Sequence, residues 1–118
     1  MKIVITIQGG NDLTAKLDSR FGRCEAFMVV DSDKKEVIEV VPNQEKNAAH
    51  GAGVGAAAKV AELGADAVIS GRFGPKAASG LKAEKITMYN APDGKSVEDI
   101  LDMLEKGEIE EQTMREYR

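Results

Sequence analysis

The sequence predicts a single α/β domain with a mixed five-stranded sheet, in the element order β-β-β-α-β-α-β-α. Short β-branched runs dominate the first part of the chain. From residue 52 onward, strand-like runs alternate with segments whose apolar residues recur at helical spacing. A length of 118 residues suits one domain with its own core. We therefore expect helices on the faces of the sheet, in an arrangement close to three layers.

Three apolar runs, at residues 3–7, 26–30 and 37–41, predict the first three strands. The second and third runs flank a short polar segment, which is typical of a β-hairpin. Pro42 ends the third strand because proline cannot donate to a sheet ladder. Residues 8–22, between the first two strands, are polar and too long for a hairpin loop, so they are a candidate functional loop.

Glycine, proline and serine mark the boundaries of the helices. Gly64 ends the first helix, and Pro75 stands at the first position of the second, where its missing N–H costs nothing. Ser96 caps the third, with Asp99 placed roughly as the acid of a capping box. The expected elements are a helix at 52–63, a strand at 67–70, a helix from 75, a strand at 86–89 and a helix at 96–106.

The formal charge of −4 is concentrated near the C-terminal end of the sequence. Residues 95–118 hold four basic and eight acidic residues, whereas basic and acidic residues balance in residues 1–94. We expect a domain over residues 1–107 and a solvated acidic tail over residues 108–118. A general nucleic-acid-binding protein would need a net basic face, so nucleic acid is not an expected partner.

One cysteine excludes an internal disulfide framework and fits a reducing compartment. No apolar run approaches the ~20 residues needed to cross a membrane. The N-terminus enters a strand pattern at once and lacks a small-residue cleavage site, unlike a signal peptide. We expect a cytoplasmic protein without membrane association.

Three glycine-bearing stretches carry the residues that could bind a ligand, at 18–24, 47–53 and 71–75. The tripeptide Arg-Phe-Gly occurs in two of them, beginning at Arg20 and at Arg72. Arginine offers a rigid fork of donors for anions, and the helix starts near Gly53 and Pro75 add N–H groups with a positive dipole end. The stretches together predict an anion pocket. The alternative is that the arginines pair with surface acids.

Cys24 and His50 are the only cysteine and the only histidine. Cys24 is either a soft metal ligand, with a thiolate favoured by Arg20 and Arg23, or a small buried residue. His50 precedes a helix, where it is either a metal ligand or an exposed loop residue. Together they cannot complete a four-ligand zinc site, so they would complete a pre-assembled cluster or bind metal across a dimer.

The segment Gly51-Ala52-Gly53-Val54-Gly55-Ala56 matches the loose dinucleotide-binding pattern in the wrong context. That pattern follows directly on a strand and needs an acid at a strand end ~20 residues later, and neither condition is met. We interpret these glycines as sites of close packing or ligand approach. The sequence shows neither the carboxylate set of a two-metal nuclease nor a Ser–His–Asp arrangement, so we do not expect an enzyme.

At these stretches the chain resembles the dinitrogenase iron–molybdenum cofactor-binding family, which includes NifX and NifB C-terminal-like domains. The resemblance spans most of the chain, from residue 3 to residue 107, with motifs in matching order. Its matching residues are Ser19 to Cys24, Asn43, His50 to Gly53, Gly64, Asp66, Gly71, Gly74, Pro75 and Gly94.

The resemblance implies a ribonuclease-H-like fold without nuclease chemistry. It also implies a non-catalytic carrier that transiently binds an anionic iron–sulfur or iron–molybdenum cluster or its precursor, with a cluster donor or acceptor protein as partner. Members that stand alone occur also in organisms that do not fix nitrogen, so the resemblance leaves the physiological ligand open. The candidate cofactor-binding residues are Arg20, Arg23, Cys24, His50, Gly51, Gly53, Arg72 and Gly74, with Cys24 and His50 as metal ligands.

Two other classes of function remain open. A phosphate- or nucleotide-binding regulatory module would use the same glycines and arginines without metal. A small interaction protein would instead dock a partner through the acidic tail.

Overall fold

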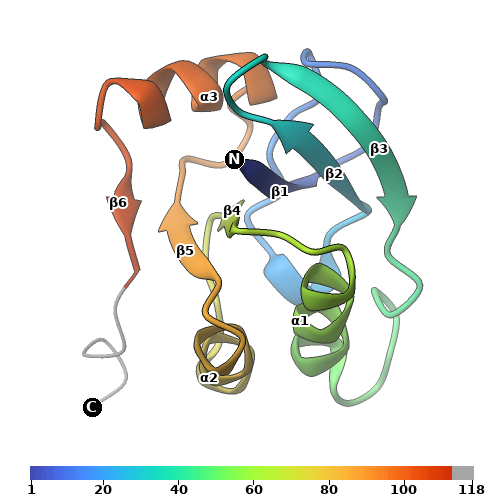
Figure 1. Ribbon diagram of the computed structural model, residues 1–118. Helices are drawn as coiled ribbons and strands as arrows, with labels where there is room; N and C mark the ends of the chain where they lie inside the picture. The colour runs from blue at the N-terminus through green and yellow to red at the C-terminus, as the bar shows by residue number, and fades with distance from the viewer. Residues whose placement is uncertain (113–118) are drawn as a thin grey trace.

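The computed structural model describes residues 1–112, which form one six-stranded sheet with helices on both faces (Figure 1). The sheet order is β3-β2-β1-β4-β5-β6. The strands are β1 (Lys2–Ile7), β2 (Ala26–Asp31), β3 (Glu36–Pro42), β4 (Ala67–Ser70), β5 (Thr87–Asn90) and β6 (Glu110–Glu111). The helices are α1 (Ala52–Glu62), α2 (Pro75–Ala83) and α3 (Val97–Glu105), with a 3-10 turn η1 (Phe21–Arg23).

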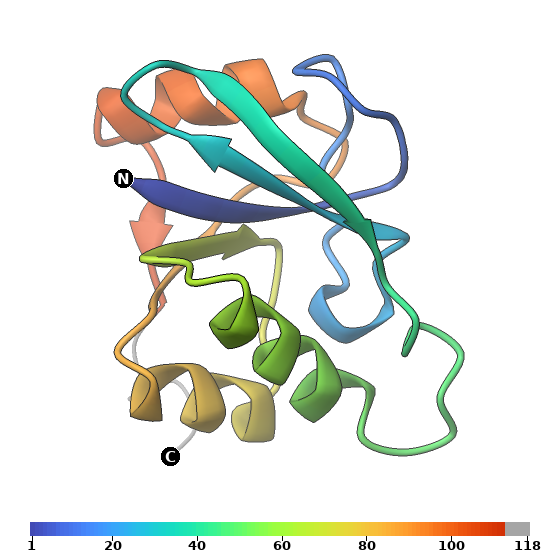
Figure 2. The same cartoon turned by 45° about the vertical axis from the view of Figure 1, so that its right-hand side comes forward.

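The sheet is mixed, as predicted. β1, β2 and β3 form an antiparallel meander, and β1, β4 and β5 are parallel. The carboxyl ends of these three parallel strands therefore share one edge of the sheet. Figure 2 shows η1 and the start of α1 close together at this edge. In open α/β sheets, ligands commonly bind outside the carboxyl ends of the strands.

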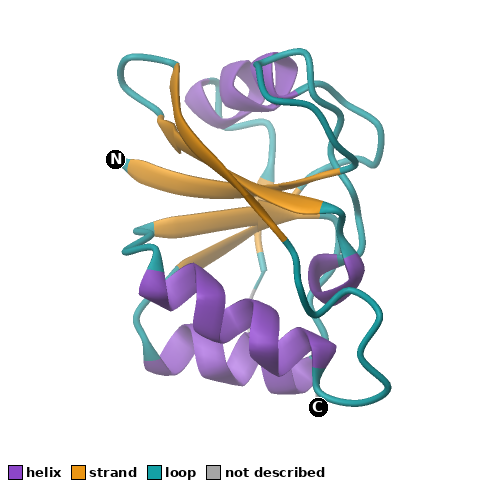
Figure 3. Ribbon diagram, turned by 90° about the vertical axis from the view of Figure 1, so that its right-hand side faces the viewer, coloured by secondary structure: helices purple, strands orange, loops and turns teal. Residues whose placement is uncertain are grey.

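The domain has three layers, with the sheet in the middle, α1 and α2 on one face and α3 on the other (Figure 3). β1 is buried on both faces because its β-branched side chains alternate between the two cores. Ile3, Ile5 and Ile7 pack on the α3 side, whereas Val4 packs on the side of α1 and α2. The central strand thereby fixes the relative positions of both helical layers.

The prediction of five strands is wrong, because β6 adds a sixth strand antiparallel to β5. Its register pairs Tyr89 with Glu111 and Asn90 with Glu110. Ile109 enters the core on the α3 side, which brings this acidic segment back onto the sheet. Residues 108–112 are thus part of the fold and not wholly solvated, while tail residues 113–118 lie outside the described residues. The expected domain limits and the ribonuclease-H-like assignment stay predictions.

The predicted helix boundaries are confirmed by their caps. Ser96 Oγ accepts a hydrogen bond from the Asp99 N–H at 3.1 Å. Pro75 occupies the first turn of α2, and Gly64 adopts a left-handed φ of 73° after α1. None of the helices within residues 1–112 combines the length and apolarity needed to cross a membrane.

Candidate functional site

The three glycine-bearing stretches meet in one open pocket of about 900 Å³. It lies between η1, the first turn of α1 and the first turn of α2. No Asp or Glu is among the described residues that line it. The side chains with cationic or imidazole groups in its lining are Arg20, Arg23, His50, Arg72 and Lys76.

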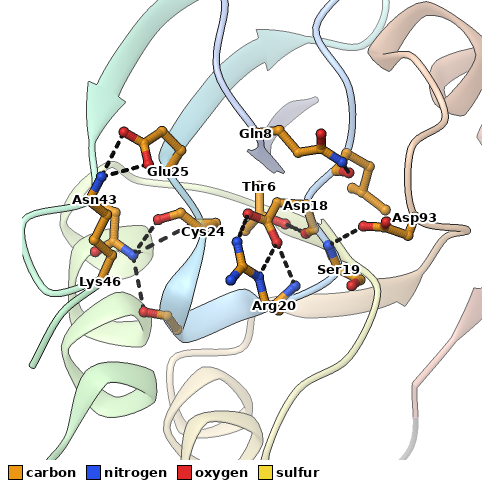
Figure 4. Close-up of polar contacts among 12 residues, drawn as sticks. Thr6, Gln8, Asp18, Ser19, Arg20, Cys24, Glu25, Asn43, Lys46 and Asp93 are labelled. Carbon is orange, nitrogen blue, oxygen red and sulfur yellow. Dashed lines mark hydrogen bonds and ion pairs between the residues drawn. The ribbon is translucent and has the colours of Figure 1, made fainter. Parts of the chain in front are cut away.

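The first stretch is held against the sheet edge by β1, by β4 and by the segment before α3. Thr6 Oγ1 in β1 donates to the Asp18 carbonyl oxygen at 2.7 Å and lies 2.8 Å from Ser70 Oγ in β4. The Ser19 N–H donates to Asp93 Oδ1 at 2.9 Å. Figure 4 shows the contacts of Thr6 with Asp18 and of Ser19 with Asp93. The buried hydroxyl groups of Thr6 and Ser70 and the exposed carboxylate of Asp93 thus fix the backbone that carries Arg20.

Arg20 forms a bidentate ion pair with Asp18 (Figure 4). Its Nε lies 3.0 Å from Oδ1 and its Nη2 lies 2.9 Å from Oδ2. Burial of the Asp18 side chain disfavours its charge, but hydrogen bonds from the Arg20 side chain and N–H lower the pKa of Asp18 overall. The Arg20 side chain remains 68% exposed, compared with 4% for Asp18. Arg20 is therefore oriented by its partner and still accessible from the pocket.

Arg23 contacts the loop between β3 and α1, which carries His50. Its Nη1 donates to the carbonyl oxygens of Lys46 at 3.0 Å and Ala48 at 2.6 Å. Lys46 in turn pairs with Glu25, with Nζ 2.6 Å from Oε2 (Figure 4). Arg23 therefore holds one wall of the pocket in addition to contributing positive charge.

Arg72 lies on the loop between β4 and α2 and forms a parallel β-bridge with Arg20. Gly71 beside it packs against Ser19 so closely that a Cβ at this position would collide with the serine. No acidic side chain within residues 1–112 forms an ion pair with Arg72. Its guanidinium, exposed at the pocket, is therefore the clearest candidate for direct contact with an anion.

The two helix starts approach η1 because small residues allow it. A Cβ on Gly22 would lie 2.7 Å from the Gly53 nitrogen, so only glycine fits there without a shift of α1. The rings of Phe21 and Phe73 pack at 4.9 Å between centroids, which joins the first and third stretches. Gly51 and Gly74 occupy the N-cap positions of α1 and α2 and offer no capping side chain. These helix starts leave N–H groups for an anionic ligand.

Cys24 has the surroundings of the buried alternative, not those of an exposed thiolate. This residue is fully buried and packs among the core residues on the side of α1 and α2, outside the pocket lining. Burial, with a further contribution from the charge of Asp18, raises the pKa of the thiol to about 12. A weak contact with Asn43 Nδ2, at 3.7 Å from Sγ, does not offset this (Figure 4).

His50 is exposed and does line the pocket. The described residues contain no group of three or more His, Cys, Asp or Glu side chains that could hold a metal ion. The other predicted residues, Arg20, Arg23, Gly51, Gly53, Arg72 and Gly74, are brought together in the lining. Joint ligation of metal by Cys24 and His50 stays a prediction.

The sequence analysis did not name two residues that belong to the site. Lys76 lines the pocket from the first turn of α2, where the preceding Gly-Pro pair was a usable signal. Asp18 orients Arg20, and its place two residues earlier was a weaker signal.

The model of the family described as dinitrogenase iron-molybdenum cofactor matches residues 1–107. The chain belongs to this family. An uncharacterized protein of Methanocaldococcus jannaschii is 33% identical over 112 residues, covering 93% of this chain and 90% of that protein. The family-matched region contains all three stretches that line the pocket.

Two solved structures of related proteins share both fold and sequence. The apo form of the orange protein from Desulfovibrio gigas superposes with a TM-score of 0.87 and 32% identity, covering 95% of this chain and 92% of that one. A NifB-like protein from Thermotoga superposes with a TM-score of 0.77 and 30% identity, covering 93% and 91%.

Proposed function

We propose that this family member is a carrier that holds an anionic iron–molybdenum or iron–sulfur cluster, or a precursor of one, without transforming it. The pocket carries the proposal, because arginine forks and two uncapped helix starts converge where none of the described lining residues is a carboxylate. Such a site favours a compact ligand of several negative charges. The family match supports a metal cluster as that ligand.

The cargo would be held mainly by hydrogen bonds and charge, not by bonds to its metal. Arg20, Arg72 and the N–H groups at the start of α1 and α2 donate to sulfide or oxo groups at the surface of the cluster. His50 is the one side chain of the described lining suited to ligate a metal. Cys24 is separated from the cargo by its burial.

A catalytic role has little support in this arrangement. Described lining residues include no carboxylate and no tyrosine, so His50 and Lys76 would be the only ordinary acids or bases among them. A single imidazole without an orienting partner suits binding better than proton transfer. We therefore propose storage or delivery of the cargo, with a cluster donor or acceptor protein as the partner.

Anaerobic titration with tetrathiomolybdate tests the proposal, because this probe combines molybdenum, sulfide and negative charge. Molybdate has the same shape and charge but oxo groups, and ATP represents the rival phosphate-binding module. We expect a saturable change in absorbance with tetrathiomolybdate and much weaker binding of the other two probes. Preference for ATP would support the metal-free regulatory module, and binding of none of the probes would overturn the carrier.

Variants of the two predicted metal ligands test the mode of binding. His50→Ala is expected to weaken tetrathiomolybdate binding or to change the absorbance of the bound probe. Cys24→Ala is expected to retain the wild-type affinity, because the thiol is buried outside the pocket. Loss of binding in Cys24→Ala, with an unchanged fold by circular dichroism, would instead establish that the thiol reaches the cargo.

A further inference from the structure

Gln112 lies beyond the family-matched residues and yet contacts the pocket loop that carries Arg72. Its backbone N–H donates to the Met88 carbonyl oxygen in β5 at 2.8 Å. Only 5% of the residue is exposed. Its side-chain Nε2 donates to the Phe73 carbonyl oxygen at 3.3 Å. A buried amide from the end of β6 is thus directed at a loop of the candidate site.

Asn90 completes this contact from the neighbouring strand. Its Nδ2 donates to Gln112 Oε1 at 2.7 Å and to the Gly71 carbonyl oxygen at 3.2 Å. The two amides therefore contact the backbone on both sides of Arg72. Gln112 is buried and Asn90 is partly buried. A buried amide group without a hydrogen-bond partner lowers the stability of the fold, so these hydrogen bonds are favoured.

On its other side, the loop between β4 and α2 packs against the first stretch, residues 18–24. Ser19 packs against Gly71, and Arg20 forms the β-bridge with Arg72. The loop is thus wedged between the first stretch and the amide pair. No acidic side chain within the described chain orients the Arg72 guanidinium, so the backbone position of the loop decides where the guanidinium lies.

We propose that Gln112 is a positioning residue for the ligand pocket, acting through the carbonyl group of Phe73 to place Arg72. This inference rests on the proposed function, because it assigns a role in cargo affinity. It adds a determinant from outside the family-matched region, at the residue that directly follows the two-residue strand β6. Members that share the pocket but lack this amide would hold Arg72 by other means or bind cargo less tightly.

The first arm of the test uses the protein without ligand. Gln112→Met keeps the length and neutrality of the side chain and removes both of its hydrogen bonds. The matched control is Gln44→Met, the same change at an exposed glutamine outside the pocket lining. We expect hydrogen exchange at the Arg72, Phe73 and Gly74 amides to accelerate by about threefold to tenfold in Gln112→Met only. Unchanged exchange at these amides would overturn the inference.

The second arm measures tetrathiomolybdate affinity in wild type, Gln112→Met, Arg72→Ala and the double variant. We expect Gln112→Met to weaken binding about tenfold in the wild-type background and to have little effect once Arg72 is removed. An equal loss in both backgrounds would overturn positioning through Arg72. If Gln112→Met does not fold, Gln112→Ala replaces it in both arms.

Failure of the proposed function is distinguishable from failure of this inference. Wild type that binds none of the probes would overturn the carrier function and, with it, the role of Gln112 in affinity. The exchange arm would still decide whether Gln112 holds the loop. Wild type that binds tetrathiomolybdate, with Gln112→Met binding it equally well, would leave the carrier intact and overturn the positioning role.

Discussion

The tripeptide Arg-Phe-Gly occurs twice at the pocket, and the two arginines have different surroundings. Arg20 is paired with buried Asp18, which fixes its guanidinium and lowers the pKa of the carboxyl group. Arg72 has no acidic partner within residues 1–112, and its place depends on how its loop is held. The first arginine therefore serves the fold and the pocket together, whereas the second is left for a ligand.

The two glycines of the repeated tripeptide differ in the same way. Gly22 lies against the backbone of Gly53, where any side chain would push α1 away. Gly74 begins α2, and a Cβ there would meet nothing within 4 Å. Identical local sequence thus marks both walls of the pocket, but tertiary contacts decide which glycine packs against another helix and which has free space beside it.

The largest expected effect is a difference in the free energy of unfolding between alanine variants of the two glycines. Gly22→Ala is expected to cost about 2–3 kcal/mol, because its Cβ would force η1 and α1 apart. Gly74 has a φ of −69°, which alanine adopts readily, and a Cβ there would meet nothing within 4 Å. The free energy of unfolding of Gly74→Ala should therefore stay within about 0.5 kcal/mol of wild type. Urea unfolding measures both. Equal losses would show that the space at Gly74 is needed for folding and not for a ligand.

A smaller effect is expected on breaking the Asp18–Arg20 pair. Asp18→Asn should cost about 1–2 kcal/mol at pH 7, since hydrogen bonds to a charged group are lost. The pKa of Asp18 in the folded protein is below its ordinary value of 3.8, so this contribution is present above that pH. It is lost as pH falls through the lower, folded pKa.

Acid titration of stability checks that sign. The difference in free energy of unfolding between wild type and Asp18→Asn should narrow steadily below pH ~4, where Asp18 of the unfolded chain binds a proton while Asp18 of the folded protein is still ionised. A difference that is independent of pH down to pH ~2 would mean that the carboxylate charge contributes nothing, and that the comparison between the two arginines rests on geometry alone.

Arg72→Ala is expected to have little effect on the free energy of unfolding but a clear effect on tetrathiomolybdate binding. Truncation of an exposed side chain that has no ion-pair partner within residues 1–112 should leave the free energy of unfolding within about 0.5 kcal/mol of wild type. Tetrathiomolybdate affinity should fall about tenfold, as for loss of a charge-assisted contact. Arg20→Ala is the comparison, and we expect it to lower the thermal midpoint and to weaken binding less. The reverse order of affinities would assign the ligand contact to Arg20.

Much of this fold was predictable because its strands are compact apolar runs and its helices carry local caps. Ser96 and Pro75 act within a single helical turn, so their roles follow from neighbouring residues alone. The meeting of the three stretches was also predictable, since parallel strands bring their carboxyl ends to one edge. β6 was not predictable, because a two-residue acidic strand is recognisable only beside the free edge of β5.

For Cys24 the sequence left a metal ligand and a buried residue both open, because closeness along the chain does not establish closeness in space. Arg23 is its neighbour in sequence, but Arg23 ends the turn η1 whereas Cys24 already has extended backbone, and the two side chains contact different parts of the protein. Arg23 reaches the β3–α1 loop while the thiol enters the core. Arg20, the other expected partner, is already engaged by Asp18. Both outcomes depend on long-range packing, which no local pattern encodes.

The arrangement of the pocket also bears on the order of events during synthesis. The first stretch, residues 18–24, is translated early. Gln112, which we propose positions Arg72, is translated after the rest of the described chain. At about 5–20 residues per second, the delay is on the order of 10 s. A nascent chain therefore displays Arg20 long before Arg72 is in place, and a cargo anion would find no complete binding site on an unfinished polypeptide.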